Sequence, residues 1–130
     1  MLRFVTSTRH RHQRGSVIGR IWHGWTAPAN ADAYESLLRT TILPGITRIV
    51  GYEGAHLLRH DRAEEVEFVT ITWFASEEAV RAFAGPDDAR AVVPDAARAL
   101  LTRFDERSAH YTLVFSSGDS HGPPTGAASR

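Results

Sequence analysis

Hydrophobic and polar positions in the first part of the chain predict a strand followed by a helix. Residues 16–26 are β-branched or aromatic over most of their length, which is typical of a strand. Pro28 ends this segment, and Asn30 is a suitable N-cap for a helix that continues to Leu43. The Pro-Gly pair at positions 44–45 is expected to stop that helix.

The rest of the chain predicts a hairpin, further helices and a last strand. The expected elements are, in order, strands at about 53–60 and 65–74, a helix between Ser76 and Gly85, a short helix at 95–102 and a strand at 104–116. A polar turn joins the first two strands, as in a β-hairpin. The order β-α-β-β-α-(α)-β predicts an α+β, ferredoxin-like βαββαβ domain with an antiparallel sheet.

Large apolar side chains occur in both phases of the predicted strands. In the third strand one phase is Glu67, Val69, Ile71 and Trp73, and the other is Phe68, Thr70, Thr72 and Phe74. Two helices cover only one face of such a sheet, so a second apolar face needs a partner. A large apolar side chain left in water forfeits roughly 1.5–3 kcal/mol. We therefore expect a homodimer, a dimeric α+β barrel whose two sheets stack around a cavity.

The two phases are assigned to faces as follows. The phase of Phe68 and Phe74 is expected to look into the cavity on the sheet face, together with Arg20 and Trp22 of the first strand. Trp73 is expected in the helix-covered core.

Length and composition limit the chemistry. The 130 residues suffice for one core, and we expect one domain at 16–116 between a flexible basic arm at 1–15 and a disordered tail at 117–130. The absence of cysteine excludes thiolate chemistry, and the absence of lysine excludes Schiff bases. Fifteen basic and fifteen acidic residues give zero net charge, which argues against a nucleic-acid partner.

The lengths of the apolar segments also indicate where in the cell the protein lies. None is long enough to span a bilayer, and no apolar segment follows Arg3 and Arg9 as in a secretory signal. We expect a cytoplasmic protein without a membrane partner.

Three segments resemble the antibiotic biosynthesis monooxygenase family. They are IGRIWHGWTAPANADAYESLL, LPGITRIVGYEGAHLLR and EVEFVTITWFASEEAVRAFAG, within residues 16–115. The resemblance implies a dimeric α+β barrel. It also implies the chemistry of those members that need no cofactor, in which polar and aromatic cavity residues stabilise a substrate carbanion that reacts directly with oxygen.

Haem-degrading members of the same superfamily have an Asn on the first strand and a Trp and a His near the second helix. The positions that match here hold Trp22 (or His23), Phe83, and Val92 or Val93. None of the three residues is retained, so the resemblance disfavours haem degradation.

Three residues are candidates for catalysis. Arg20 could bind an enolate, phenolate or carboxylate, or could instead form a salt bridge across a dimer interface with Glu67 or Glu106. His110 could accept a proton from a phenolic or 1,3-dicarbonyl substrate, or could be a hydrogen-bonded surface or interface histidine. His56 on the second strand is a similar but weaker candidate.

Five residues are candidates for substrate binding, by their place in the cavity phase: Trp22, Phe68, Thr70, Thr72 and Phe74. No histidine pair has a carboxylate at ligand spacing, so we expect no metal, and no cofactor. The sequence thus favours a cofactor-independent, monooxygenase-like enzyme acting on an aromatic or polyketide-like small molecule. The alternatives are a non-catalytic dimeric module that binds a small hydrophobic ligand or a protein, and a barrel filled by its own side chains.

Overall fold

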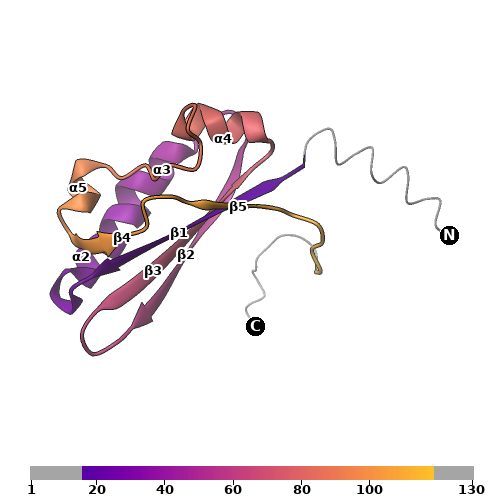
Figure 1. Cartoon of the computed structure of the whole chain (residues 1–130). Coiled ribbons are helices and arrows are strands. Elements are labelled where there is room, and N and C mark those ends of the chain that lie inside the picture. Colours follow the sequence, from indigo (N-terminus) through magenta and orange to yellow (C-terminus); the bar gives the residue numbers. More distant parts are fainter. Residues whose placement is uncertain (1–15, 119–130) are drawn as a thin grey trace, which may run out of the picture.

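A five-stranded antiparallel sheet with helices on one face forms the domain (Figure 1). The computed structural model describes residues 16–118. The strands are β1 (Ile18–Thr26), β2 (Tyr52–Asp61), β3 (Val66–Phe74), β4 (Leu101–Phe104) and β5 (Ala109–Thr112). Their spatial order is β2-β3-β1, with β4 and β5 sharing the other edge of β1. This confirms the ferredoxin-like α+β class; the arm expected at 1–15 and most of the expected tail lie outside the described residues.

The first helical region is longer than predicted. It runs through η1 (Pro28–Asn30), α2 (Ala31–Leu37), the π-helical turn η2 (Leu38–Ile42) and α3 (Leu43–Ile46). The expectation that the Pro-Gly pair at 44–45 stops the helix is wrong. Pro44 lies in the first turn of α3, directly after the π-helical turn η2, and the helical backbone continues past it to Ile46. Asn30 is at the N-cap of α2, but its side chain makes no capping bond.

The second helix is α4 (Glu77–Ala84), and its predicted cap is confirmed. Ser76 Oγ accepts a hydrogen bond of 3.1 Å from the backbone N–H of Ala79, and Glu77 and Glu78 lie in the first turn, where the helix dipole favours anions. Gly85, with φ 90°, ends the helix.

The last part of the domain differs from the prediction. The helix α5 covers only Asp95–Arg98, because residues 101–104 pair with β1 as β4 instead of continuing the helix to Thr102. Of the predicted strand at 104–116, only Phe104, the last residue of β4, and residues 109–112, which form β5, are in strands. Asp105 N–H still donates to His23 O of β1 (3.0 Å), and the backbone then leaves β1 and pairs with residues 89–91: Ala91 N–H donates to Glu106 O (2.9 Å) and Ser108 N–H to Ala89 O (2.6 Å).

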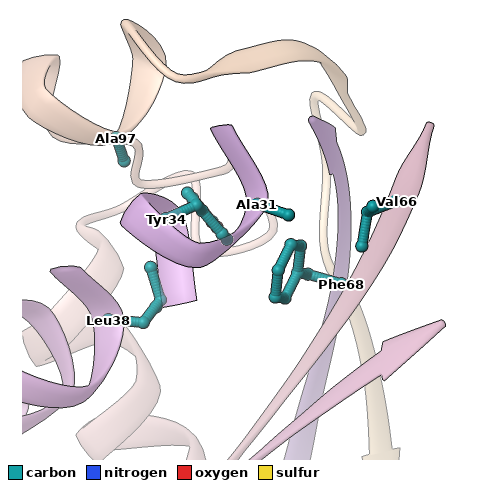
Figure 2. Packing of buried hydrophobic residues seen from close by; sticks show 6 residues of the cluster. All are labelled: Ala31, Tyr34, Leu38, Val66, Phe68 and Ala97. Atoms are coloured by element: carbon teal, nitrogen blue, oxygen red, sulfur yellow. The ribbon is translucent and has the colours of Figure 1, made fainter. Parts of the chain in front are cut away.

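The helices cover the sheet face that carries Phe68 and Phe74. Both rings are fully buried, in two clusters that also contain helix residues. Figure 2 shows Ala31, Tyr34 and Leu38 of the first helical region opposite Phe68 and Val66 of β3. The predicted assignment of the two phases to the two faces is therefore wrong, and the structure exchanges them. The helix-covered phase holds Phe68, Phe74, Arg20 and Trp22, whereas Trp73 lies on the open face.

The open face keeps an apolar surface. Ile21, Trp25, Ile71 and Trp73 are only half-buried there, and Tyr111 of β5 is 59% exposed. The expectation that two apolar faces exist is confirmed, although they carry the opposite residues. Nothing within residues 16–118 covers this face.

Gly51, just before β2, is expected to tolerate no side chain. Its φ is +96°, and a Cβ built there would lie 2.5 Å from the Cβ of Ala79 on α4. Gly51→Ala should therefore lower the free energy of unfolding by about 2–4 kcal/mol, which urea denaturation measures. The control is Gly45→Ala in α3, where nothing lies within 4 Å of the new methyl group and no loss is expected. Equal stability of the two variants would contradict this account of the turn.

Candidate functional site

A cavity of about 60 Å³ lies between the sheet and the helices. Its polar wall comes from the strands and from the loop before β5, and its apolar wall from the helices and residues 92–94. The polar lining residues are Arg20, Thr70, Thr72 and Ser108, and the aromatic ones are Trp22, Tyr34 and Phe83. The cavity was expected on the sheet face away from the helices. It lies under them instead, because the phase that carries these side chains is the covered one.

Arg20 is the charged group of this cavity and is only 4% exposed. Its guanidinium donates to the backbone oxygens of Asp88 and Arg90 (2.9 Å for Arg90) and to Nε2 of His110 (2.8 Å). These partners use three of the five N–H groups that an arginine carries. Burial lowers the pKa of Arg20, and the charge of Asp88 acts in the opposite direction. The side chain still remains a cation at neutral pH.

A salt bridge from Arg20 across a dimer interface, the alternative, would need a carboxylate of a second copy to reach a side chain that is only 4% exposed, and within one chain Arg20 pairs with neither Glu67 nor Glu106. Glu67 lies on the open face and pairs with His23 at 2.8 Å and with Arg62 at 3.8 Å. No carboxylate within residues 16–118 is close enough to Arg20 for an ion pair. No carboxylate of this range is therefore paired with Arg20, whose contacts are peptide oxygens, His110 and the more distant charge of Asp88, and the guanidinium is available to an anion.

His110 lies beside Arg20 but does not line the cavity. Because a guanidinium can only donate, Nε2 of His110 accepts the hydrogen bond, and the ring carries its proton on Nδ1. Burial, and secondarily the charge of Arg20, lower the pKa of His110. The residue is a neutral imidazole that holds Arg20 in place.

Several hydroxyl groups surround the cavity. Thr70 Oγ1 is buried and has no hydrogen-bond partner among the described residues. Buried polar groups in proteins are nearly always bonded, so this one is suited to a ligand atom. Burial raises the pKa of Tyr34 to about 12, which keeps its phenol protonated and able to donate at neutral pH. Thr72 and Ser108 complete the polar wall.

The other predicted residues are divided between the cavity, the core and the open face. Trp22 lines the cavity, and its indole N–H donates to Asp105 O at 2.6 Å. Phe68 and Phe74 are core residues behind the cavity wall and do not line it. His56 is exposed on the open face, where its Nδ1 accepts a 3.3 Å hydrogen bond from Trp73. The structure does not bring His56 together with Arg20 and His110.

Sequence reasoning did not assign Tyr34, Ser108, Phe83 or residues 92–94 to the site, although Phe83, Val92 and Val93 hold positions that match the Trp and His of haem-degrading members. For Tyr34 a signal existed, because it lies four positions before Leu38 on the buried face of its helix. For Ser108 none existed, because the break between β4 and β5 depends on hydrogen bonds to residues 89–91.

Two further properties concern the described part of the chain. In residues 16–118 no three histidine or acidic side chains are grouped so that they could hold a metal ion. No helix in this range has the length and apolar character needed to cross a membrane.

Protonation of His110 is expected to destabilise the fold. Its folded pKa lies below the ordinary 6.5, so the unfolded chain binds the proton more tightly. The stability contribution is complete above pH 6.5 and is lost as the pH falls from 6.5 through the folded pKa. Urea denaturation at a series of pH values should show a steeper loss of unfolding free energy in the wild type than in His110→Gln. His60→Gln, exposed on β2, should keep the wild-type slope; the same slope in all three proteins would contradict the prediction.

Comparisons with known proteins agree with this architecture. The sequence profile of the family described as "Antibiotic biosynthesis monooxygenase" matches residues 18–95. A search of curated proteins gave no match. Among solved structures, a Bacillus cereus protein assigned to the same monooxygenases has 17% identity and a TM-score of 0.57, covering 80% of this chain and 99% of its own.

Two Streptomyces structures are also similar. The N63A mutant of SnoaB, a cofactor-independent oxygenase from Streptomyces nogalater, has 23% identity and a TM-score of 0.51, covering 82% of this chain and 99% of its own. The ActVA-Orf6 monooxygenase of Streptomyces coelicolor, in complex with nanaomycin D, has 17% identity and a TM-score of 0.55, covering 83% and 96%. At these identities the structures show a shared fold, and the profile match extends over more than half of the sequence. The chain therefore belongs to the antibiotic biosynthesis monooxygenase family.

Proposed function

We propose that this protein is a cofactor-independent monooxygenase that oxidises a small aromatic or polyketide-like hydroxy compound beside Arg20. The observation that carries the proposal is a buried guanidinium without a carboxylate partner, facing a cavity together with the unbonded hydroxyl of Thr70. Family membership supports it, and SnoaB, which is named a cofactor-independent oxygenase, shares the fold.

Arg20 would act on the hydroxyl group of the substrate. A charge-assisted hydrogen bond to a phenolate or enolate oxygen is stronger than one to the neutral hydroxyl, so the arginine lowers the pKa of the bound group. The proton passes to water. The resulting anion places electron density on a ring carbon, which can donate electrons to oxygen.

The oxidation balances without a further reductant. The ring carbon forms a C–O bond with O₂ to give a peroxide, the C–H proton at that carbon leaves, and the O–O bond breaks. One oxygen atom becomes the new carbonyl of a quinone, and the other leaves as hydroxide and is protonated to water. The substrate supplies all four electrons.

We assign His110 to positioning Arg20. Its Nε2 lone pair accepts from the guanidinium and is not available to the substrate. Trp22 and Tyr34 would contact the bound ring, and Thr70 and Thr72 its oxygen atoms.

A homodimer through the open sheet face is part of the proposal. Half-buried Ile21, Trp25, Ile71 and Trp73 form an apolar surface of the kind that a second copy covers. Sedimentation equilibrium at micromolar concentration should give twice the 14.4 kDa mass of the chain. A stable monomer would contradict this part.

One observation favours the alternative of a non-catalytic module. The cavity of about 60 Å³ is smaller than the roughly 300 Å³ expected of a site that encloses a whole ligand. Oxygen uptake separates the two functions. Protein treated with a chelator and given no flavin or metal should consume one O₂ per quinone formed from hydroxynaphthalenes or anthrones, and ¹⁸O₂ should label the product. Absence of uptake with every such compound, or uptake only after a metal is added, would refute the oxygenase.

A further inference from the structure

An apolar groove of about 310 Å³ adjoins the cavity at Arg20. The groove and the cavity have five lining residues in common: Ile42, Ile46, Phe83, Val92 and Pro94. The groove lies along the helical region that ends in α3 and along the segment before α5. Its remaining lining residues are Leu37, Thr41 and Ala96. The two spaces therefore border on the same five side chains, which we call the neck, and we infer that one ligand can occupy both.

Polarity divides this site into two parts. The inner part carries Arg20, Thr70, Thr72 and Ser108, whereas no charged residue lines the groove. An ionised group in the groove would find no charged partner and only the hydroxyl of Thr41, whereas the same group in the inner part would gain several polar partners. A ligand is therefore expected to enter with its oxygen-bearing edge first and to leave its apolar body in the groove.

Size limits what each part accepts. A space of about 60 Å³ holds on the order of four water molecules, by the roughly 15 Å³ that each requires. It can take a hydroxyl group and the ring edge that bears it, but not a complete ring system. A groove of about 310 Å³ is at the lower limit of the range of about 300–1,000 Å³ found for small-ligand sites.

The neck is held in place by aromatic packing. Phe83 of α4 stacks on the buried Phe74 at 5.6 Å, and the guanidinium carbon of Arg20 lies 5.3 Å from the centre of the Phe83 ring. Phe83 thus connects the charged group of the inner part with the apolar wall of the groove. A flat ring that crosses the neck can lie against it.

We propose that the site takes a compact two-ring phenol, with one ionisable oxygen at the inner end and no charged group at the outer end. This proposal specifies the substrate class of the proposed function, and turnover of such a phenol rests on that function. Binding of the phenol, in contrast, depends only on the geometry of the cavity and the groove.

The test is calorimetric titration of the full-length protein with 1-naphthol, naphthalene, phenol and a three-ring hydroxyanthracene. We expect 1-naphthol to bind at least tenfold more tightly than naphthalene, which lacks the oxygen, and phenol, which lacks the second ring. The hydroxyanthracene should bind more weakly than 1-naphthol. Equal affinities for 1-naphthol and naphthalene, tighter binding of the three-ring compound, or no binding of 1-naphthol would overturn the proposal.

Two matched variants locate the ligand. Ala96→Phe fills the groove and should raise the Kd of 1-naphthol at least tenfold, whereas Ala82→Phe, exposed on α4 outside both linings, should leave it unchanged. Thr70→Val should reduce the preference for 1-naphthol over naphthalene. Identical affinities in the two phenylalanine variants would overturn the inference even if turnover were found. If the ligands and variants show the expected affinities but no oxygen is taken up, the inference about the ligand is supported and the oxygenase is refuted.

Discussion

Replacing Arg20 with methionine is expected to lower kcat/KM of the proposed oxygenation by about 100- to 1,000-fold, the range found when one group that stabilises a developing oxyanion is removed. Methionine keeps much of the apolar stem of arginine but removes the cation that faces the cavity. The pKa of the bound hydroxyl then returns towards its value in water, and less of the reactive anion is present. Steady-state oxygen uptake across a pH series measures the effect, and part of the activity should return at high pH, where the substrate ionises unaided.

The control for this substitution is Arg39→Met, at an exposed arginine outside the cavity. It should leave kcat/KM unchanged. Arg20→Lys keeps the charge but not the forked geometry that reaches both Asp88 O and Arg90 O, so an intermediate loss is expected. Thermal denaturation of each variant separates a chemical effect from unfolding. Wild-type activity in a folded Arg20→Met protein would show that this cavity is not where oxidation occurs.

Phe68→Ala is expected to lower the free energy of unfolding by about 3–5 kcal/mol, a large part of the stability of an ordinary domain. The ring is fully buried beneath the helices, 4.8 Å from the ring of Tyr34, and Arg59 lies over it at 5.6 Å. Removing it leaves a void that the packed strand and helix cannot close. Urea denaturation followed by circular dichroism measures the loss.

Phe115→Ala is the matched control, because that ring is 77% exposed. Its effect should stay within about 0.5 kcal/mol. A loss of less than about 1 kcal/mol in Phe68→Ala would instead favour the assignment predicted from the sequence, in which Phe68 lies on the uncovered face of the sheet.

Local sequence signals predicted most of the elements. The hairpin of β2 and β3 and the Ser76 cap are set by neighbouring residues, so alternation and capping patterns found them. The interruption between β4 and β5 was not predictable in this way, because residues 106–108 pair with residues 89–91, about 17 positions earlier. Local preference for a strand carries no information about such a partner.

The sequence also grouped Arg20, Trp22, Thr70 and Thr72 correctly, since alternation along paired strands places them on one face. Which face that is could not be read from size alone, because both phases hold large rings. The pair His23 and Glu67 shares its phase with Trp73 and favours the exposed side. The charge of Arg20 favours the opposite assignment, and the arginine can be buried because Asp88 O, Arg90 O and His110 Nε2 accept hydrogen bonds from it.

The claim that the reactive site lies under the helices at Arg20 is tested most directly by a crystal structure with bound 1-naphthol. We predict the naphthol oxygen within hydrogen-bond distance of the Arg20 guanidinium or Thr70 Oγ1, and the second ring beside Phe83 in the groove. A naphthol molecule on the open sheet face, against Trp25 or Trp73, would contradict the account.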